Sequence, residues 1–271
     1  MHLGDILMSN QNDTGKYDTQ EVVNSHLSKY YDRMRKAKGK SLIILGNHDG
    51  LLGSAPTENG SYPAIGTYSF CERPKDKPYF FFDNINDKVR CVCLVAPYIK
   101  DGKETWAFGE EQINWLIDTA LNVDDGWHVL FFSHAPSFST DIIVWKDYAD
   151  IAGIINAFNN HTTFETSKVK TADFSSKAST KSVAWICGHE HYDMVVRDNS
   201  YYTHYNLVCP IIITACNYRY GLSGNVPGAT YPTRKANSVT EDLLDTMVYR
   251  RDENKVYMVR FGAGEDREVN V

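Results

Sequence analysis

The stretch that decides the fold is residues 183–191, which read Val183-Ala184-Trp185-Ile186-Cys187-Gly188-His189-Glu190-His191. The first five residues are apolar and predict a short strand that ends at Gly188. Two histidines follow at alternate positions, which point to one side of an extended chain. Because open α/β sheets place ligand sites in the loops just beyond strand ends, this stretch predicts a strand with a binding site at its carboxyl end.

Three other segments have the same form, an apolar run that ends in polar residues able to bind metal. They are Leu3-Gly4-Asp5, Leu45-Gly46-Asn47-His48-Asp49 and Phe132-Ser133-His134-Ala135. A glycine before the ligand lets the chain turn sharply or approach another backbone closely. Alone, His134 is typical of a core histidine and Asn47 of a turn residue. Their shared form and order along the chain favour one common site.

The residue types in this set predict the metal chemistry. One carboxylate (Asp5), one amide (Asn47) and three imidazoles (His134, His189 and His191) suit the borderline divalent ions Mn, Fe, Co, Ni and Zn. The carboxylate of Asp5 can bridge two ions. Two ions roughly 3.5–4 Å apart can hold both ends of an in-line displacement at phosphorus. We therefore expect two divalent metal ions and hydrolysis of a phosphate ester.

Helical and strand patterns are mixed along the whole chain, which predicts an α/β fold built in layers. No internal repeat or linker is visible, so we expect a single domain over residues 1–271. The polar segment 162–182 is expected to be a mobile excursion. Periodicity predicts helices at 17–37, 109–121 and 148–158, and strands at 41–45, 66–70, 78–83, 89–95, 127–133, 183–187, 211–215, 245–250 and 255–261.

Composition limits the partners. The net charge of −6 argues against broad binding to nucleic acid by phosphate neutralisation. It does not exclude a phosphate ester held by metals, because bound cations reverse the local charge. No apolar run approaches the length of a membrane span. The expected partner is a small phosphate ester or a phosphorylated polymer, with no membrane, and the oligomeric state stays open.

The cysteines and the first residues bear on the cellular location. The chain has six cysteines and no C-x-x-C pair. We expect buried, reduced thiols, which favour the cytoplasm, whereas their spacing does not support a zinc site. No signal peptide is visible. Almost no residues precede Gly4, so we expect a strand–helix unit to be missing before Met1, and a secretion signal would be missing with it.

Together, these motifs resemble the calcineurin-like metallophosphoesterases, from Gly4 to about His191. The most specific matches are Gly46-Asn47-His48-Asp49 and Gly188-His189-Glu190-His191, and Gln112-Ile113-Asn114-Trp115-Leu116 resembles a helical segment of the family. The resemblance implies a four-layer α/β/β/α sandwich of two mixed sheets flanked by helices, here without its first strand–helix unit. It also implies a metal-dependent phosphatase or phosphodiesterase.

The resemblance assigns a role to each residue. Asp5 would bridge both metals, and Asn47, His134 and His189 would complete one metal site. His191 would bind the other metal. His48 would not be a ligand; it would stabilise the phosphoryl charge and protonate the leaving oxygen. A hydroxide that bridges the metals would be the nucleophile.

Two departures from the family pattern leave alternatives open. The family's first Asp-x-His motif is absent before Gly4, so one metal would have four protein ligands and the other only two. Met8 stands where many members carry an aspartate that orients the catalytic histidine. A single-metal site, or a degenerate member that acts as a binding or assembly module, therefore remains an alternative. A nuclease of the same fold would need a basic groove, which the acidic charge does not support.

Overall fold

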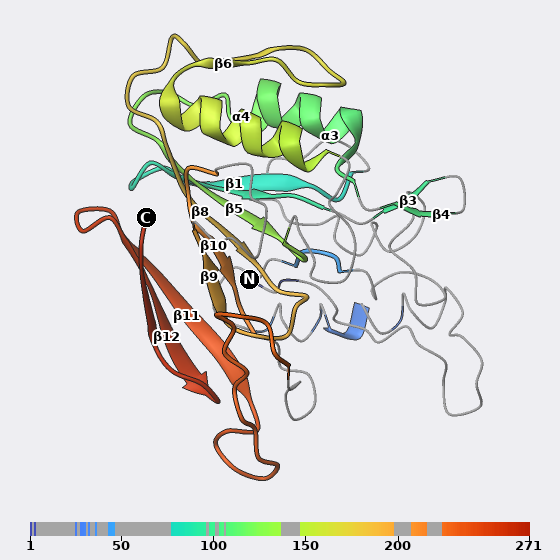
Figure 1. Ribbon diagram of the computed structural model, residues 1–271, viewed down its shortest axis with the longest axis vertical. Coiled ribbons are helices and arrows are strands. Elements are labelled where there is room, and N and C mark those ends of the chain that lie inside the picture. Colours follow the sequence, from blue (N-terminus) through green and yellow to red (C-terminus); the bar gives the residue numbers. More distant parts are fainter. Residues whose placement is uncertain are drawn as a thin grey trace.

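The computed structural model describes most of the chain after residue 76 and a few residues before it (Figure 1). The described fold is mixed α/β, as the sequence predicts. The described residues are 1, 3, 25, 28–30, 32, 36, 43–46, 77–95, 107–136, 147–197, 207–215 and 224–271, and the backbone of 98–100 and 103–105. The predicted strand at 66–70 lies outside them.

A mixed six-stranded sheet forms the centre of the molecule. Its order is β1-β2-β5-β8-β10-β9, in which β2, β5, β8 and β10 are parallel and the two edge strands are antiparallel. Ser133 at the end of β5 pairs with Cys187 at the end of β8, so both strands deliver the chain to the same edge. The bounds are β1 (Phe80–Asn84), β2 (Val89–Cys93), β5 (His128–Ser133), β8 (Lys181–Cys187), β9 (Met194–Val196) and β10 (Ile211–Ile213).

The buried strand β8 explains why this sheet is central. From Ser182 to Cys187 every residue is buried, which is typical of a strand covered on both faces. Trp185 is fully buried, and its indole Nε1 donates to Ser133 Oγ at 2.9 Å. Ser133 Oγ in turn donates to the carbonyl of Ala135 at 2.6 Å. The polar atoms beneath the predicted site are therefore satisfied and hold the ends of β5 and β8 together.

Helices α3 (Gly109–Trp115) and α4 (Tyr148–Asn160) cover one face of this sheet (Figure 1). The predicted helix at 109–121 continues beyond α3 as the π-helix η2 (Leu116–Ala120), in which Leu121 N donates to Leu116 O at 2.9 Å. Buried Gln112 explains the first position of the motif Gln112-Ile113-Asn114-Trp115-Leu116. Its amide accepts from Val95 N at 2.9 Å and donates to Val95 O at 2.8 Å, which fastens α3 to the chain beyond β2.

The segment at 162–182 is an ordered covering of α4, which makes the expected mobile excursion wrong. It contains the short pair β6 (Thr163–Phe164) and β7 (Ala172–Asp173) and the start of β8. Ser167 donates to the carboxylate of Asp150 from its backbone N and its Oγ, at 2.7 and 2.8 Å. These hydrogen bonds to buried Asp150 on α4 stabilise a segment whose composition alone predicts a loop. Two further strands, β3 (Tyr98–Lys100) and β4 (Lys103–Thr105), form a separate hairpin.

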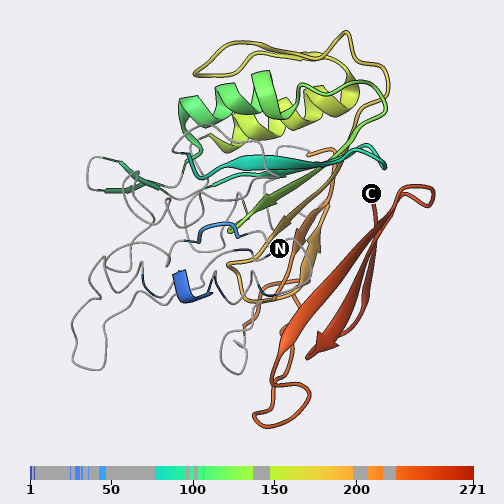
Figure 2. The same ribbon diagram turned by 180° about the vertical axis from the view of Figure 1, so that it is seen from behind.

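A three-stranded antiparallel sheet packs on the face away from α3 and α4 (Figures 1 and 2). It consists of β11 (Leu243–Arg250), β12 (Lys255–Gly262) and β13 (Arg267–Asn270). Val256, Met258 and Val269 point inward and join the core of the large sheet. We expected two mixed sheets, but both pairings here are antiparallel. Strand β13 escaped prediction because Val269 is its only apolar residue.

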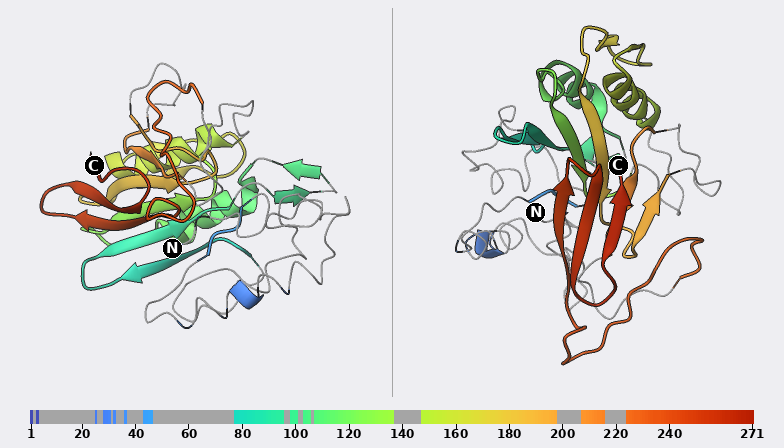
Figure 3. Two further views of the ribbon diagram at one scale, coloured as in Figure 1. Left: turned by 90° about the horizontal axis from the view of Figure 1, so that it is seen from below. Right: turned by 90° about the vertical axis from the view of Figure 1, so that its left-hand side faces the viewer.

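The described segments before residue 47 lie on the side of the six-stranded sheet away from α3 and α4 (Figures 1 and 3). Residues 43–46 are buried, but of these only Ile43 makes a β-bridge, so the strand at 41–45 stays a prediction. Residues 25, 28–30 and 32 are helical, within the predicted helix at 17–37. In the described ranges no helix is both long and apolar enough to cross a membrane. The four described cysteines, Cys91, Cys93, Cys187 and Cys209, are free thiols.

At the amino end of β5, a buried histidine meets a tyrosine of the second sheet. His128 Nδ1 lies 2.5 Å from Tyr249 Oη. Burial, followed by the charges of Arg251 and Lys181, lowers the pKa of His128 to about 4. Burial raises the pKa of Tyr249 to about 12. The tyrosine therefore keeps its proton and donates it to an uncharged imidazole at neutral pH.

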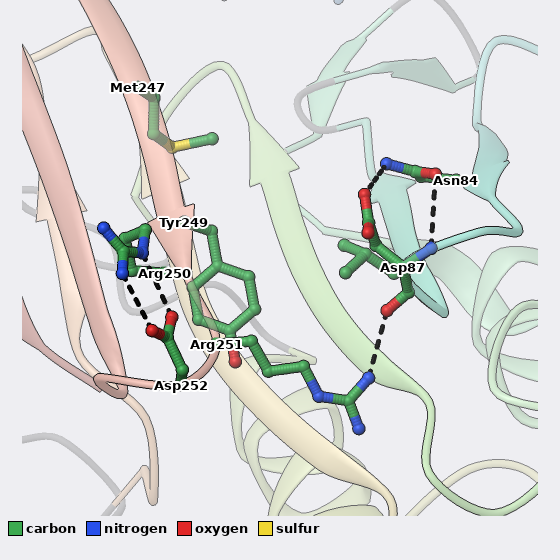
Figure 4. A pocket seen from close by; sticks show the side chains of 8 residues that line it. Asn84, Asp87, Met247, Tyr249, Arg250, Arg251 and Asp252 are labelled. Carbon is green, nitrogen blue, oxygen red and sulfur yellow. Dashed lines mark hydrogen bonds and ion pairs between the residues drawn. The ribbon is translucent and has the colours of Figure 1, made fainter.

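Tyr249 also lines a cavity of about 460 Å³ between the two sheets (Figure 4). Its arginines are already paired: Arg251 donates to the carbonyls of Asp87 and Gly126, and Arg250 donates to Asp252. The cavity lies beside the start of β5, about 17 Å from the other end of that six-residue strand. It is therefore separate from the predicted metal site.

We expect His128 to make stability depend on pH. Its pKa in the folded chain is about 4, against 6.5 as the ordinary value, so the unfolded chain binds more protons between these values. Stability should be complete above pH 6.5 and fall by about 3 kcal/mol as the pH drops toward 4. Thermal melting of the unmodified protein and of His128→Gln, followed from pH 7.5 to 4.5, checks this. Equal acid sensitivity in the two proteins would contradict it.

Candidate metal centre

Two of the predicted ligands, His134 and His189, meet at the carboxyl edge of the parallel strands. His134 Nε2 and His189 Nδ1 are 3.1 Å apart, and the two rings cross at 76° with their centroids 5.0 Å apart. His134 is only 2% exposed, whereas His189 is half-buried. The parallel pairing of β5 and β8 produces this meeting, because each histidine lies one or two residues beyond a strand end.

A backbone contact sets the tautomer of His134. Its Nδ1 lies 2.6 Å from the carbonyl oxygen of Leu3. A carbonyl can only accept, so Nδ1 must carry the hydrogen. In the neutral ring, Nε2 then presents its lone pair toward His189. Metal-binding histidines are usually held in this way, with the second ring nitrogen donating to a carbonyl or carboxylate.

The separation of the two nitrogens fits shared coordination of one ion. Ligand nitrogens lie about 2.0–2.1 Å from zinc, so two of them at angles of 90–109° are roughly 2.8–3.4 Å apart. The observed 3.1 Å falls within this range. In the absence of an ion, one of the two nitrogens carries a hydrogen and donates it to the other, so the same separation is that of a hydrogen bond. The pair is therefore suited to a proton or to a divalent cation.

The backbone on the strand side of the loop is firmly held. Gly188 N donates to His134 O at 2.7 Å, and Thr214 N donates to Cys187 O at 2.8 Å. A Cβ on Gly188 would lie 3.6 Å from His134 O and from Leu3 Cβ, which is ordinary contact. The described geometry therefore does not require glycine at this position, whereas from the sequence we expect a glycine there for a sharp turn or a close backbone approach.

The loop after β8 has an uncommon backbone conformation. The φ angles of His189 and His191 are 65° and 60°, in the left-handed region that few non-glycine residues adopt. β8 ends at Cys187, so neither histidine lies on an extended strand. Strand alternation was therefore the wrong reason for grouping them. Such a conformation costs free energy and persists only where surrounding contacts impose it.

The remaining predicted site residues lie outside the described part. Asp5, Asn47 and His48 are not among the residues that the structure describes. Their described neighbours are Leu3, which packs against the core and contacts His134, and buried Gly46. Among the described residues, no group of three or more His, Cys, Asp or Glu side chains could hold a metal ion. The described ranges thus contribute a histidine pair, with His191 two residues further along.

Neither Cys187, at this edge, nor Cys209, before the amino end of β10, has a thiol suited to bind metal. Burial, followed by the charge of Glu190, raises the pKa of the Cys187 thiol well above its usual value. Burial raises the pKa of Cys209 to about 12. A thiolate is the form that binds metal, so both cysteines act as small apolar groups, as the sequence predicts.

Sequence reasoning missed Asp193, which lies two residues after His191. Its carboxylate is buried and binds Ala215 N, Arg260 and Arg267. The two arginines are more than 60 residues away in the sequence, so no local pattern announced the contact. The one available signal was an acidic residue directly before the apolar run Met194-Val195-Val196.

We expect the tautomer of His134 to be visible in the metal-free protein. With histidine labelled by ¹⁵N and metal removed by a chelator, one imidazole should show a protonated Nδ1 and an unprotonated Nε2. That signal should disappear in His134→Gln and remain in His161→Asn, which replaces a histidine at the end of α4. A protonated Nε2 on His134 would contradict the assignment.

No protein-family model matches this chain, and the search of curated proteins finds no match. The case for a metal centre therefore rests on the motifs of the sequence and on the His134–His189 pair.

Proposed function

We propose that this protein is a metal-dependent phosphoesterase of the calcineurin-like type, which hydrolyses a phosphomonoester or a phosphodiester. The observation that carries the proposal is the approach of His134 Nε2 to His189 Nδ1, with the far nitrogen of His134 held by a backbone carbonyl. The two histidines come from motifs 55 residues apart. Their meeting supports the prediction that the four motifs build one site.

The layer order supports the finer fold that we propose, a four-layer α/β/β/α sandwich. Three layers follow one another in the described part: helices α3 and α4, the six-stranded sheet and the three-stranded sheet. The fourth layer would come from the segment predicted as helix at 17–37, whose described residues 25, 28–30 and 32 are helical. Such a sandwich would bring residues 43–46 and the start of the chain to the metal edge.

The proposed ligand set follows from the motifs. Asp5, Asn47, His134 and His189 would hold one divalent ion, and Asp5 and His191 would hold a second. Mn, Fe, Co, Ni and Zn all suit these donors, and a single ion is the simpler alternative for this chain. A bound ion would supply Lewis acidity toward the phosphoryl oxygens and lower the pKa of a bound water.

The side chains have separate tasks in this proposal. His134 would be held in its ligand tautomer by Leu3 O, which also raises the basicity of the free nitrogen. His48 would bind a phosphoryl oxygen and give a proton to the leaving oxygen. The substrate would be a small phosphate ester or a phosphorylated polymer, and the loops outside the sheets would select it.

Replacement of the two kinds of histidine should have different effects. His48→Gln should lower turnover of p-nitrophenyl phosphate or bis-p-nitrophenyl phosphate about 10²–10⁴-fold with Mn present, because an acid is lost. Its metal content should stay unchanged. His134→Gln should lose both metal and turnover, because a ligand is lost. Elemental analysis and steady-state kinetics on the same preparations check both results.

The matched control is His161→Asn, since asparagine tolerates the left-handed conformation of His161. This variant should keep the metal content and turnover of the unmodified protein. An unmodified protein that takes up no metal and turns over neither ester would overturn the proposal. Full activity in His48→Gln would reject only the role of His48.

A further inference from the structure

We propose that Asp193 is a positioning residue, which holds the loop of His189 and His191 in its binding conformation through Arg260 and Arg267. The inference rests on the proposed metal site for its purpose. Its evidence is separate: a buried ion-pair cluster joins the end of this loop to the second sheet. None of the metal-binding motifs predicted from the sequence includes these residues.

The loop needs support on both sides. Two of its residues, His189 and His191, have left-handed backbone angles, and Glu190 N donates to Gly188 O at 2.8 Å. On the strand side, hydrogen bonds from Gly188 N and Thr214 N fix the chain. A strained turn relaxes unless its other side is also fixed. Asp193, two residues after His191, has described contacts that can do this.

Asp193 is held by its backbone and by its side chain. Its N donates to Thr230 O and its O accepts from Thr230 N, both at 2.8 Å. Its Oδ1 accepts hydrogen bonds from Ala215 N at 3.0 Å and from Arg260 Nη2 at 2.8 Å, and it forms an ion pair with Arg267 Nη1 at 3.0 Å. The side chain is only 6% exposed. Five contacts therefore fix a residue two positions beyond His191.

The charges of the cluster balance. Arg260 and Arg267 each also bind Asp245 on β11, at 2.7 Å, so two cations face two anions. Arg260 donates to Ala263 O at 2.8 Å, and Arg267 donates to Ile213 O at 3.0 Å at the end of β10. A buried network of this kind holds its geometry only when every member is present. The second sheet therefore restrains the loop of His189 and His191 through its contacts with Asp193.

Asp245 provides the matched control. It is buried to a similar extent, with 10% of its side chain exposed, and its described hydrogen bonds go to the same two arginines. It lies on β11 and not in the loop. Loss of either carboxylate unbalances the cluster equally, but only loss of Asp193 releases the chain next to His191. A comparison of the two separates general stability from positioning.

The test uses the full chain, freed of metal, with Asp193→Ala, Asp193→Asn and Asp245→Ala. Both alanine variants should melt at lower temperature by similar amounts. Calorimetric titration with Mn²⁺, well below these temperatures, should show at least tenfold weaker binding for Asp193→Ala and less than twofold change for Asp245→Ala. Asp193→Asn should recover part of the affinity, because its amide oxygen still accepts from Ala215 N.

Hydrogen exchange in the metal-free proteins gives an independent readout. Backbone amides of residues 188–192 should exchange faster in Asp193→Ala than in Asp245→Ala. Equal affinities and equal exchange in the two alanine variants would overturn the inference and leave Asp193 a purely structural residue. If the unmodified chain binds no Mn²⁺, the proposed function fails, and exchange alone decides whether Asp193 positions the loop. If Asp193→Ala does not fold, Asp193→Asn is compared with Asp245→Asn by the same two measurements.

Discussion

The parallel pairing of β5 with β8 is the constraint on which the rest of the molecule depends. It sets Ser133 opposite Cys187, and the residues that follow must therefore leave the sheet side by side. The buried side chains of β8 leave this register little freedom, since a slip by one residue would turn the apolar residues of a strand to the opposite face. The helices on one face and the antiparallel sheet on the other supply the cover that two buried strands require.

Much of this architecture was predictable from local pattern, for identifiable reasons. Continuous apolar runs marked β5 and β8, and helical spacing marked α3 and α4. Short or polar strands escaped, since β9 has three residues and β13 has one apolar side chain. These strands form because neighbouring strands are already in the sheet. Those neighbours are distant in the sequence, so they produce no hydrophobic periodicity within the short strand itself.

The candidate site, like the fold, was predictable from the sequence only in part. A histidine at the end of an apolar run was enough to single out His134, and glycine followed by histidine singled out His189; the structure brings both together. The contacts that orient them were beyond sequence reasoning. The carbonyl of Leu3 is a backbone group, which every residue possesses, and Asp193 finds its arginines in strands that look like an ordinary polar hairpin. Residue types reveal donors to a metal, whereas three-dimensional pairing reveals what holds the donors in place.

The sequence separations of these contacts have a consequence for biosynthesis. The bond from His134 to Leu3 spans 131 residues, and that from Arg260 to Asp193 spans 67. Contacts of such long range close late in folding, after the intervening chain has been ordered. A nascent chain that had emerged only as far as Arg250 would already carry every proposed ligand, yet neither arginine of the cluster. The proposed metal site would therefore gain this support only after Arg260 and Arg267 had emerged and paired with Asp193 and Asp245.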